Sequence, residues 1–379
     1  METLDELRNQ IDSIDQTLAD LMNQRMNVSR KVAEYKSQNH SPIFHADREE
    51  QIIQNFLKNF ETDRACLARS VYQSFIRSSR ALQYQYQAER GIDSAMVSLL
   101  KNAPHTAESV NTVCYQGVPG AWSHSAAKKI YPGKETVSVL SFEEIFTAIK
   151  EGRAQAGVLP LDNTTAGAVD DVYDLLIKYD CMIQTAKSYP IHHCLLATPG
   201  ATKDTIKTVY SHPQGLAQCI SYIQSNGFSS CAETNTAVAA KKISEKQDET
   251  IAAIASRETA ELYGLCVLEE NINDSKCNQT RFVSIARHCT VSEDANRISL
   301  AFRLPNQSGA LANILGLFSD YGINLLKISS RPIPNQPWEY CFYLDCAIEQ
   351  LDRNICGLLN QLNAELGWIK LLGCYCEKN

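Results

Sequence analysis

The first 90 residues contain no glycine and a single proline, Pro42. Residues that break helices are therefore almost absent, which excludes a region of many tight turns and favours long helices. Apolar side chains recur there every three or four positions, as in an amphipathic helix. The repeat comprises Leu4, Leu7, Ile11, Ile14, Leu18 and Leu21. It continues to Tyr35 and predicts a first helix of more than about 30 residues.

Other absences narrow the class of protein. No run approaches the roughly 18 apolar residues of a membrane span, and no basic segment precedes an apolar one at the N-terminus. The 14 cysteines include no C-x-x-C pair, and the net charge is -7. We therefore expect a cytoplasmic protein with free, buried thiols and no metal site, which binds neither nucleic acid nor membranes.

The remaining chain has three patterns. Further helices are predicted at 46–58 and 63–89, and Gly91 with Pro104 indicates a linker or frayed helix end. From Val113, short apolar runs alternate with helical stretches, which is typical of α/β architecture. From Arg297, the predicted order is βαββαβ, a small sandwich of ferredoxin type. We expect a helical domain at 1–92, a linker at 93–111, and two further domains at 112–290 and 296–376.

The spacing of basic residues on the first helix predicts an association between chains. Arg25 and Lys36 are 11 residues apart and share one face within roughly 20°. Arg8 faces elsewhere and lies about 25 Å along the axis from Arg25. If both arginines bind one small molecule, Arg8 must come from a second subunit. So long a helix usually pairs with another helix, which favours a homodimer or higher homo-oligomer.

This segment resembles the all-helical chorismate mutase family. The resemblance is carried by Leu7-Arg8, Arg25, Lys36, Asp47-Arg48-Glu49 and Ser79 with Gln83. It implies that Arg8, Arg25 and Arg48 hold substrate carboxylates and that Lys36 and Gln83 face the ether oxygen. Glu49 and Ser79 would contact the rest of the ligand. His45 stands where the family usually has aspartate, so we expect mutase activity to depend on pH between roughly 5 and 8.

The middle segment has five motifs in one order. They are Gly117-Val118-Pro119-Gly120 before Ser123-His124, Pro160–Thr165, Ser211–Gln214 with Gln218, Glu233–Thr236, and Thr280-Arg281-Phe282. Together they resemble prephenate dehydratase, whose fold is two α/β lobes similar to periplasmic ligand-binding proteins, with the active site in the cleft. No metal or organic cofactor is implied. His192-His193 could suggest a metal site, but neighbouring side chains in a strand point to opposite faces.

The resemblance implies roles for residues of the cleft. Thr280 would donate a proton to the departing hydroxyl, because a hydroxyl within hydrogen-bond reach can do so. The other implied substrate-binding residues are Asp162, Asn163, Thr164, Ser211, Gln218, Glu233, Arg281 and Phe282.

The tail resembles an ACT domain, a small regulator that binds amino acids. The resemblance rests on Ser308-Gly309-Ala310-Leu311, Ser330-Arg331-Pro332 and Asn335–Trp338. It implies phenylalanine binding by Gly309–Leu311 and Ser330–Pro332, and inhibition of the dehydratase. Ser329 replaces the usual glutamate, yet we expect inhibition to persist.

We therefore expect a multidomain enzyme of L-phenylalanine biosynthesis. It would have an all-α chorismate mutase segment, a two-lobed α/β dehydratase domain and an α+β ferredoxin-like ACT domain. It would rearrange chorismate to prephenate and then convert prephenate to phenylpyruvate. Two alternatives stay open: an arogenate dehydratase with a mutase attached, and a sensor without catalysis.

Overall fold

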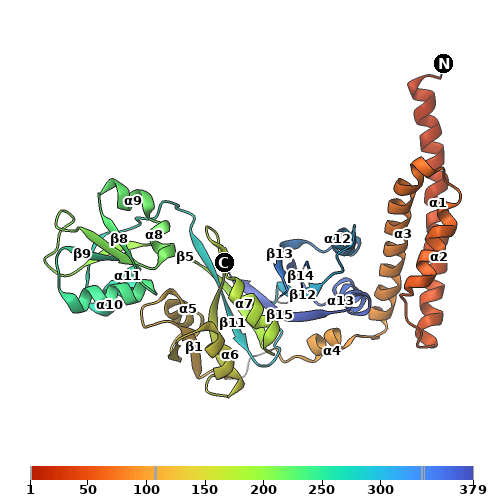
Figure 1. Cartoon of the computed structure of the whole chain (residues 1–379). Helices are drawn as coiled ribbons and strands as arrows, with labels where there is room; N and C mark the ends of the chain where they lie inside the picture. The colour runs from red at the N-terminus through yellow and green to blue at the C-terminus, as the bar shows by residue number, and fades with distance from the viewer. Residues whose placement is uncertain (1, 106–108, 334–335, 337, 379) are drawn as a thin grey trace. The chain divides into compact units, whose positions relative to one another are not determined.

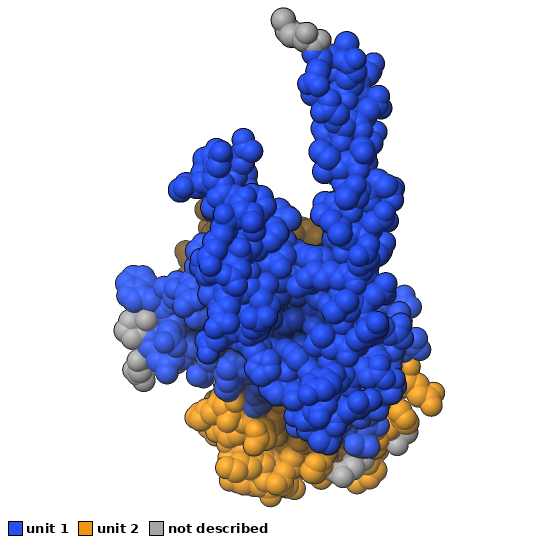
Figure 2. All heavy atoms as spheres, turned by 90° about the vertical axis from the view of Figure 1, so that its right-hand side faces the viewer, with its two compact units in different colours: residues 1–102, 298–371 blue, residues 103–297, 372–379 orange. Residues whose placement is uncertain are grey.

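The computed structural model describes residues 2–105, 109–333, 336 and 338–378. They form two compact units (Figure 2). Unit 1 comprises residues 1–102 and 298–371, so it combines the helical segment with most of the tail. Unit 2 comprises residues 103–297 and 372–379. Within the residues described, none of the helices has the length and apolar character of a membrane span.

The helical segment of unit 1 consists of three helices (Figure 1): α1 Leu4–Gln38, α2 Ala46–Leu57 and α3 Thr62–Glu89. The predicted long first helix is therefore confirmed. It begins at a capping box, in which the Thr3 side chain accepts from the Glu6 amide and Glu6 accepts from the Thr3 amide. Residues 2–24 are all exposed, and this part of α1 stands away from the rest of unit 1 (Figure 2).

A fourth helix, α4 Ala95–Asn102, lies where the sequence indicated a linker or frayed helix end. Met96, Val97 and Leu100 are buried on one side of it. Its start is held by Asn360 of the tail, whose side chain accepts from the Ser94 amide at 2.7 Å. Packing against the tail therefore stabilises a helix that local propensity left uncertain.

The tail has the predicted order βαββαβ. Its sheet has the strand order β13-β14-β12-β15, and β13 and β14 are antiparallel with Arg331 opposite Cys341. Residues 372–378 of β15 belong to unit 2. The elements are β12 Arg297–Arg303, α12 Ala310–Asp320, β13 Leu325–Pro332, β14 Tyr340–Ala347, α13 Arg353–Glu365 and β15 Ile369–Lys378.

Unit 2 has two lobes. In the first, the sheet order is β15-β5-β11-β3-β1-β2, with β4 paired to β3. Strands β3 and β5 flank β11, and both run antiparallel to it. The elements are β1 Thr112–Gln116, α5 Trp122–Ile130, β2 Glu135–Val139, α6 Phe142–Lys150, β3 Ala156–Asn163, β4 Gly167–Ala168, α7 Asp170–Lys178, β5 Met182–Pro190 and β11 Gln279–Ala286.

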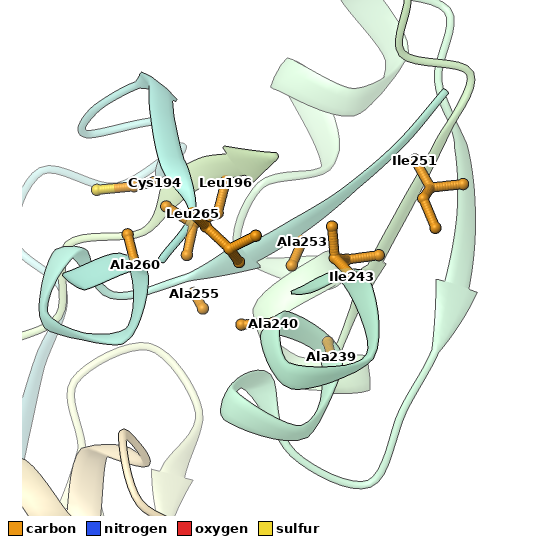
Figure 3. Close-up of a cluster of buried hydrophobic side chains, with 10 residues drawn as sticks. All are labelled: Cys194, Leu196, Ala239, Ala240, Ile243, Ile251, Ala253, Ala255, Ala260 and Leu265. Atoms are coloured by element: carbon orange, nitrogen blue, oxygen red, sulfur yellow. The ribbon is translucent and has the colours of Figure 1, made fainter. Parts of the chain in front are cut away.

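The second lobe is a five-stranded sheet of order β10-β6-β9-β7-β8. Ala239 and Ala240 of α10 pack on Ala253 and Ala255 of β9 (Figure 3), and these small side chains allow the helix to approach the sheet closely. The elements are β6 Cys194–Ala197, β7 Thr208–Ser211, α8 Pro213–Ala217, α9 Ile220–Ser225, β8 Ser229–Ala232, α10 Thr236–Lys246, β9 Ile251–Ala255, α11 Arg257–Tyr263 and β10 Cys266–Glu269.

Candidate active sites

A cavity of about 420 Å³ lies among α1, α2 and α3. This volume falls within the roughly 300–1,000 Å³ of small-molecule sites. Seven of the eight residues proposed from the helical segment line it: Arg25, Lys36, His45, Arg48, Glu49, Ser79 and Gln83. Residues up to 58 positions apart, from Arg25 to Gln83, thus surround one space.

The cavity is built to receive an anion. Arg25, Lys36, Arg48 and Arg80 line it, whereas Glu49 is the one carboxylate among its lining residues. One terminal nitrogen of Arg25 is buried and has no hydrogen-bond partner among the described residues. Leaving such a donor unsatisfied costs about 1–3 kcal/mol or more, so a bound carboxylate would stabilise it. Arg25 is held against the ring of Phe75, at 4.7 Å from the ring centroid.

Lys36 lies at the end of α1, where its Nζ donates to the Ile43 carbonyl at 2.6 Å. Burial lowers the pKa of Lys36, and the nearby carboxylate of Glu49 opposes this shift. Glu49 therefore helps to keep the ammonium group charged.

Ser79 and Gln83 are buried on α3. The Ser79 hydroxyl is 2.7 Å from the Ser29 hydroxyl, and the Gln83 carbonyl oxygen is buried without a partner among the described residues. His45 occupies the N-cap position of α2, but its side chain makes no capping hydrogen bond. These groups can contact a ligand directly.

Arg8 lies apart from this cavity. It is on the exposed part of α1 and forms a 3.2 Å ion pair with Asp5. A single chain therefore does not bring Arg8 together with the other seven residues.

A second cavity, of about 380 Å³, lies in unit 2 and is lined by both lobes. Of the residues proposed for the cleft, it brings together Asn163, Gln218, Thr280 and Phe282. Thr280 on β11 is opposite Asn163 on β3 in the antiparallel register. Their side chains therefore lie on the same face of the sheet.

The Asn163 amide orients Thr280. Its Nδ2 donates to Thr280 Oγ1 at 2.8 Å, while its Oδ1 accepts from the amides of Thr165 and Ala166, each at 2.9 Å. Since backbone amides can only donate, this assignment of the Asn163 oxygen and nitrogen is required. Thr280 thus accepts from Asn163, so its own hydroxyl hydrogen is not used in this bond and can be donated to a substrate.

Hydrogen bonds link Asn163 to the second lobe. Thr165 Oγ1 donates to Asn163 Oδ1 at 2.7 Å, and Gln218 Nε2 donates to Thr165 Oγ1 at 2.9 Å. Gln218 Oε1 is 3.0 Å from His193 Nε2. Burial lowers the pKa of His193 and so favours the neutral ring. With its hydrogen on Nε2, the neutral ring can donate to Gln218 Oε1.

Asp162 and Arg281 lie on the other face of the same strands, outside the residues that line the cavity. Arg281 pairs with Asp162 at 3.4 Å and with Glu377 at 3.2 Å, and it donates to the Tyr375 hydroxyl at 2.7 Å. Alternation of side chains along a strand explains why each points away from its neighbour Asn163 or Thr280.

Three more of the proposed residues lie outside the lining. The Thr164 hydroxyl donates to the Cys277 carbonyl and accepts from the Gln279 amide, each at 2.9 Å. Ser211 is buried and donates to the Ile254 carbonyl at 2.6 Å. Glu233 forms an ion pair with Lys242. Each has an evident partner within the lobe.

The cavity also contains residues that sequence reasoning did not single out: Trp122, His193, Gln214 and Thr236. Gln214 and Thr236 belong to two of the five sequence motifs, so the motifs already indicated that they lie near the site. His193 was weighed only as a metal ligand. Trp122 begins α5, whose N-cap residue Ala121 has no side-chain bond, so the first amides of α5 are available to a carboxylate.

The residues proposed from the tail lie at the start of α12 and at the end of β13. Gly309 has φ of +82° at the N-cap of α12, a conformation that favours glycine. Ala310 lines a cavity of about 370 Å³ in unit 1, whereas Leu311 and Ser330–Pro332 are not among its lining residues. Asn335 and Pro337 lie outside the described residues. Across the described residues, no group of His, Cys, Asp and Glu could hold a metal ion.

Comparison with known proteins agrees with these three parts. Three family models match: chorismate mutase type II at residues 7–84, prephenate dehydratase at 113–290 and ACT domain at 298–362. The bifunctional chorismate mutase/prephenate dehydratase of Enterobacter agglomerans is 30% identical over 384 residues, which covers 98% of this chain and 96% of that protein. The chain belongs to the bifunctional chorismate mutase/prephenate dehydratase family. The resemblance and the three-part fold predicted from the sequence are thus confirmed.

Two other similar proteins each match part of this chain. Arogenate dehydratase/prephenate dehydratase 1, chloroplastic, of Arabidopsis thaliana is 35% identical over 279 residues, covering 69% of this chain and 71% of that protein. The crystal structure of prephenate dehydratase in complex with L-Phe from Arthrobacter aurescens is 26% identical, with a TM-score of 0.65. It covers 70% of this chain and 89% of that one.

Proposed function

We propose that the chain rearranges chorismate to prephenate in the helical cavity and converts prephenate to phenylpyruvate in the cavity of unit 2. The observation that carries the first step is the gathering of Arg25, Lys36, Arg48 and Gln83 around one space. The rearrangement needs no nucleophile or proton transfer. It needs donors that are positioned for negative charge developing on the ether oxygen, and Lys36 with Gln83 would supply them.

The second step rests on Thr280 and Asn163. The ring carboxylate leaves as carbon dioxide, its bonding electrons enter the ring, and the ring hydroxyl departs as water with a proton from Thr280 Oγ1. The hydrogen bond from Asn163 to this oxygen stabilises charge that develops when the proton leaves. Solvent then returns the proton to Thr280.

Arogenate is a second candidate substrate, because the Arabidopsis relative is named for both dehydratase activities. Arogenate has an ammonium group where prephenate has a keto group. The residues that line the cavity of unit 2 include no aspartate or glutamate to pair with an ammonium ion. This favours prephenate, and comparison of kcat/KM on the two substrates tests the preference.

The assay that tests the whole proposal supplies chorismate and follows prephenate and phenylpyruvate together. We expect prephenate first and phenylpyruvate next. If neither forms, the catalytic assignment is wrong and the sensor alternative stands. Phenylpyruvate formed from supplied prephenate without any turnover of chorismate would remove the mutase part alone.

We further propose that the tail binds phenylalanine and thereby inhibits the dehydratase, with Gly309–Leu311 and Ser330–Pro332 as its contacts. The L-Phe complex of the Arthrobacter aurescens dehydratase supports this ligand. Rising phenylalanine in the same assay should lower the rate of phenylpyruvate formation. An unchanged rate would exclude this regulation.

The assembly we propose is a homodimer through α1. Leu4, Ile11, Ile14 and Leu21 are 57–65% exposed on this helix, which is unusual for a row of large apolar side chains. A second copy of α1 would cover them and would bring Arg8 to the cavity of its partner.

We also propose a cytoplasmic location, since ten of the cysteines are buried free thiols.

A further inference from the structure

Arg80 of α3 lies between the mutase cavity and the tail. Its side chain lines the cavity that contains Lys36 and Gln83, and it also lines the neighbouring cavity that contains Ala310 of the tail. Glu49 lines both cavities as well. The resemblance to chorismate mutases assigned a role to Glu49 but none to Arg80.

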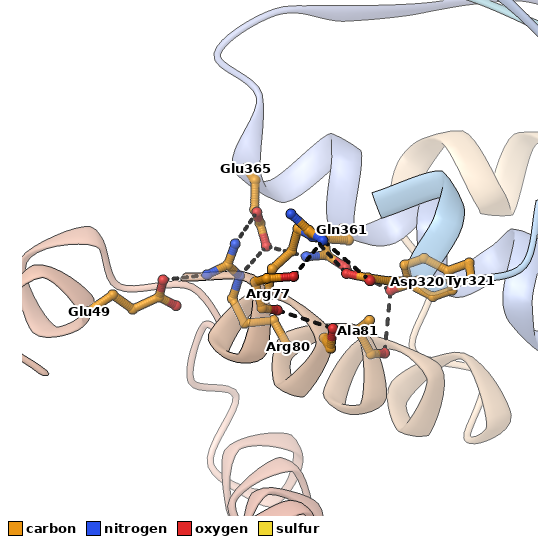
Figure 4. Close-up of polar contacts among 10 residues, drawn as sticks. Glu49, Arg77, Arg80, Ala81, Asp320, Tyr321, Gln361 and Glu365 are labelled. Carbon is orange, nitrogen blue, oxygen red and sulfur yellow. Dashed lines mark hydrogen bonds and ion pairs between the residues drawn. The ribbon is translucent and has the colours of Figure 1, made fainter. Parts of the chain in front are cut away.

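Arg80 holds two carboxylates from different parts of unit 1 (Figure 4). Its Nη1 donates to Glu49 Oε2 on α2. Its Nε and Nη2 donate to the two oxygens of Glu365 at the end of α13, at 2.8 and 3.0 Å. The three side chains are only 14%, 19% and 9% exposed for Arg80, Glu49 and Glu365. A planar guanidinium with both edges occupied has little freedom to rotate, so it determines where the Glu49 carboxylate points.

The tail continues this chain of contacts. Gln361 Nε2 donates to Glu365 Oε1 at 2.8 Å, and the hydroxyl of Tyr321, at the end of α12, is 2.8 Å from Gln361 Oε1. Burial raises the pKa of Glu365, and Arg80 opposes that shift. Burial likewise disfavours charged Arg80, but the Glu365 and Glu49 carboxylates outweigh it and raise the pKa of Arg80. The charges of Arg80 and Glu365 therefore stabilise each other in this buried position.

We propose that Arg80 is a positioning residue of the mutase site, which orients Glu49 toward the substrate, and that Glu365 of the tail holds Arg80 in place. This inference rests on the proposed mutase function. It extends the mutase site beyond the helical segment, because a residue of the regulatory tail becomes part of its support.

The test measures the mutase reaction of the full-length chain with Arg80→Gln, Arg80→Lys and Glu365→Gln. Arg80→Gln should lower kcat/KM for chorismate by about 10- to 100-fold, since a small displacement of a substrate contact has effects of that size. Arg80→Lys keeps a cation for Glu49 and should restore part of the loss. Glu365→Gln should lower kcat/KM by a smaller factor, about three- to tenfold.

A double-mutant cycle distinguishes positioning from general loss of structure. If Arg80 acts through Glu49, the double variant Arg80→Gln/Glu49→Gln is no slower than Glu49→Gln alone, and Glu365→Gln has no effect in the Glu49→Gln background. Additive losses would overturn the proposal. Should Arg80→Gln fail to fold, the cycle of Glu365→Gln with Glu49→Gln decides by the same criterion.

Arg77→Gln is the matched control. Arg77 lies on the same helix, pairs with Asp320 of the tail at 2.7 Å and is equally buried, but no contact joins it to Glu49. We expect its mutase rate to stay within about twofold of the wild type. A loss as large as that of Arg80→Gln would show that the interface as a whole, and not Glu49, is what matters. If the unsubstituted chain does not convert chorismate at all, the proposed function fails instead.

Discussion

At the scale of single residues, the proposed dehydratase reaction depends on the hydroxyl of Thr280. Asn163 already donates to its oxygen, so a substitution that removes the hydroxyl loses the proton donor and leaves the buried amide of Asn163 with one partner fewer. Thr280→Ala should lower the rate of phenylpyruvate formation from prephenate by about 100-fold or more. Thr280→Ser keeps the hydroxyl and should retain most of the rate. Equal rates for Thr280→Ala and the wild type would disprove the assignment.

Lys36 makes the pH dependence of the mutase predictable. Burial lowers the pKa of Lys36 below its ordinary value of 10.5, so the ammonium loses its proton at a lower pH than a surface lysine does. If the reaction needs this charge, kcat/KM for chorismate should fall on the alkaline side below pH 10.5. Because Glu49 raises the pKa of Lys36, Glu49→Gln should move the fall to still lower pH.

The measurement is the pH profile of each variant, normalised to its own maximum. Arg77→Gln serves as the control, since it leaves the surroundings of Lys36 unchanged. An alkaline limb at the same pH in Glu49→Gln and the wild type would contradict the coupling between Glu49 and Lys36.

At the scale of elements, the proposed pairing of α1 with a second copy would complete the mutase site. Arg8 lies about 25 Å along the helix from Arg25, so one chain cannot supply both arginines to the same small ligand. The exposed apolar side chains of α1 offer a surface on which a second copy could pack. We expect Arg8→Gln and Arg25→Gln each to abolish most mutase activity. Co-expressed together, they should restore about a quarter of the sites, since half of the dimers are mixed and one site in each is intact.

The dehydratase rate of the same preparations measures the amount of folded chain and is the internal control. Mutase activity of the mixture no higher than that of either variant alone would exclude a site shared between two copies.

How well the elements were predicted depended on local signals. The segment without glycine, with apolar residues at helical spacing, predicted α2 and α3 to within one residue at each end, and it predicted a first helix of more than about 30 residues where α1 has 35. Helix α4 was not predicted, because the residue that caps its start, Asn360, is 266 positions away in the chain. Asp162 and Arg281 were predicted beside Asn163 and Thr280, although alternation along a strand already placed neighbours on opposite faces. Arg80 could not be foreseen, since Glu365 is 285 positions distant.

At the scale of the whole molecule, unit 1 contains both the candidate mutase cavity and the residues proposed to bind phenylalanine. The contacts of Arg80 connect Glu49 to α13, and Tyr321 connects α13 to the end of α12. Helix α12 begins at Gly309, where the proposed phenylalanine site starts. A ligand that changes the position of α12 or α13 should therefore be sensed in the mutase cavity.

Thermodynamic linkage turns this into a prediction that works in both directions. If phenylalanine alters the affinity for a mutase-site ligand, that ligand must alter the affinity for phenylalanine by the same factor. We expect the Kd of phenylalanine, measured by calorimetry, to change by about fivefold or more when a stable dicarboxylate analogue of chorismate fills the mutase cavity. In Glu365→Gln the change should shrink toward none, because the connection through Arg80 is broken. An equal change in Glu365→Gln and the wild type would mean that the two sites communicate by another route, and no change in either would mean that unit 1 holds two independent sites.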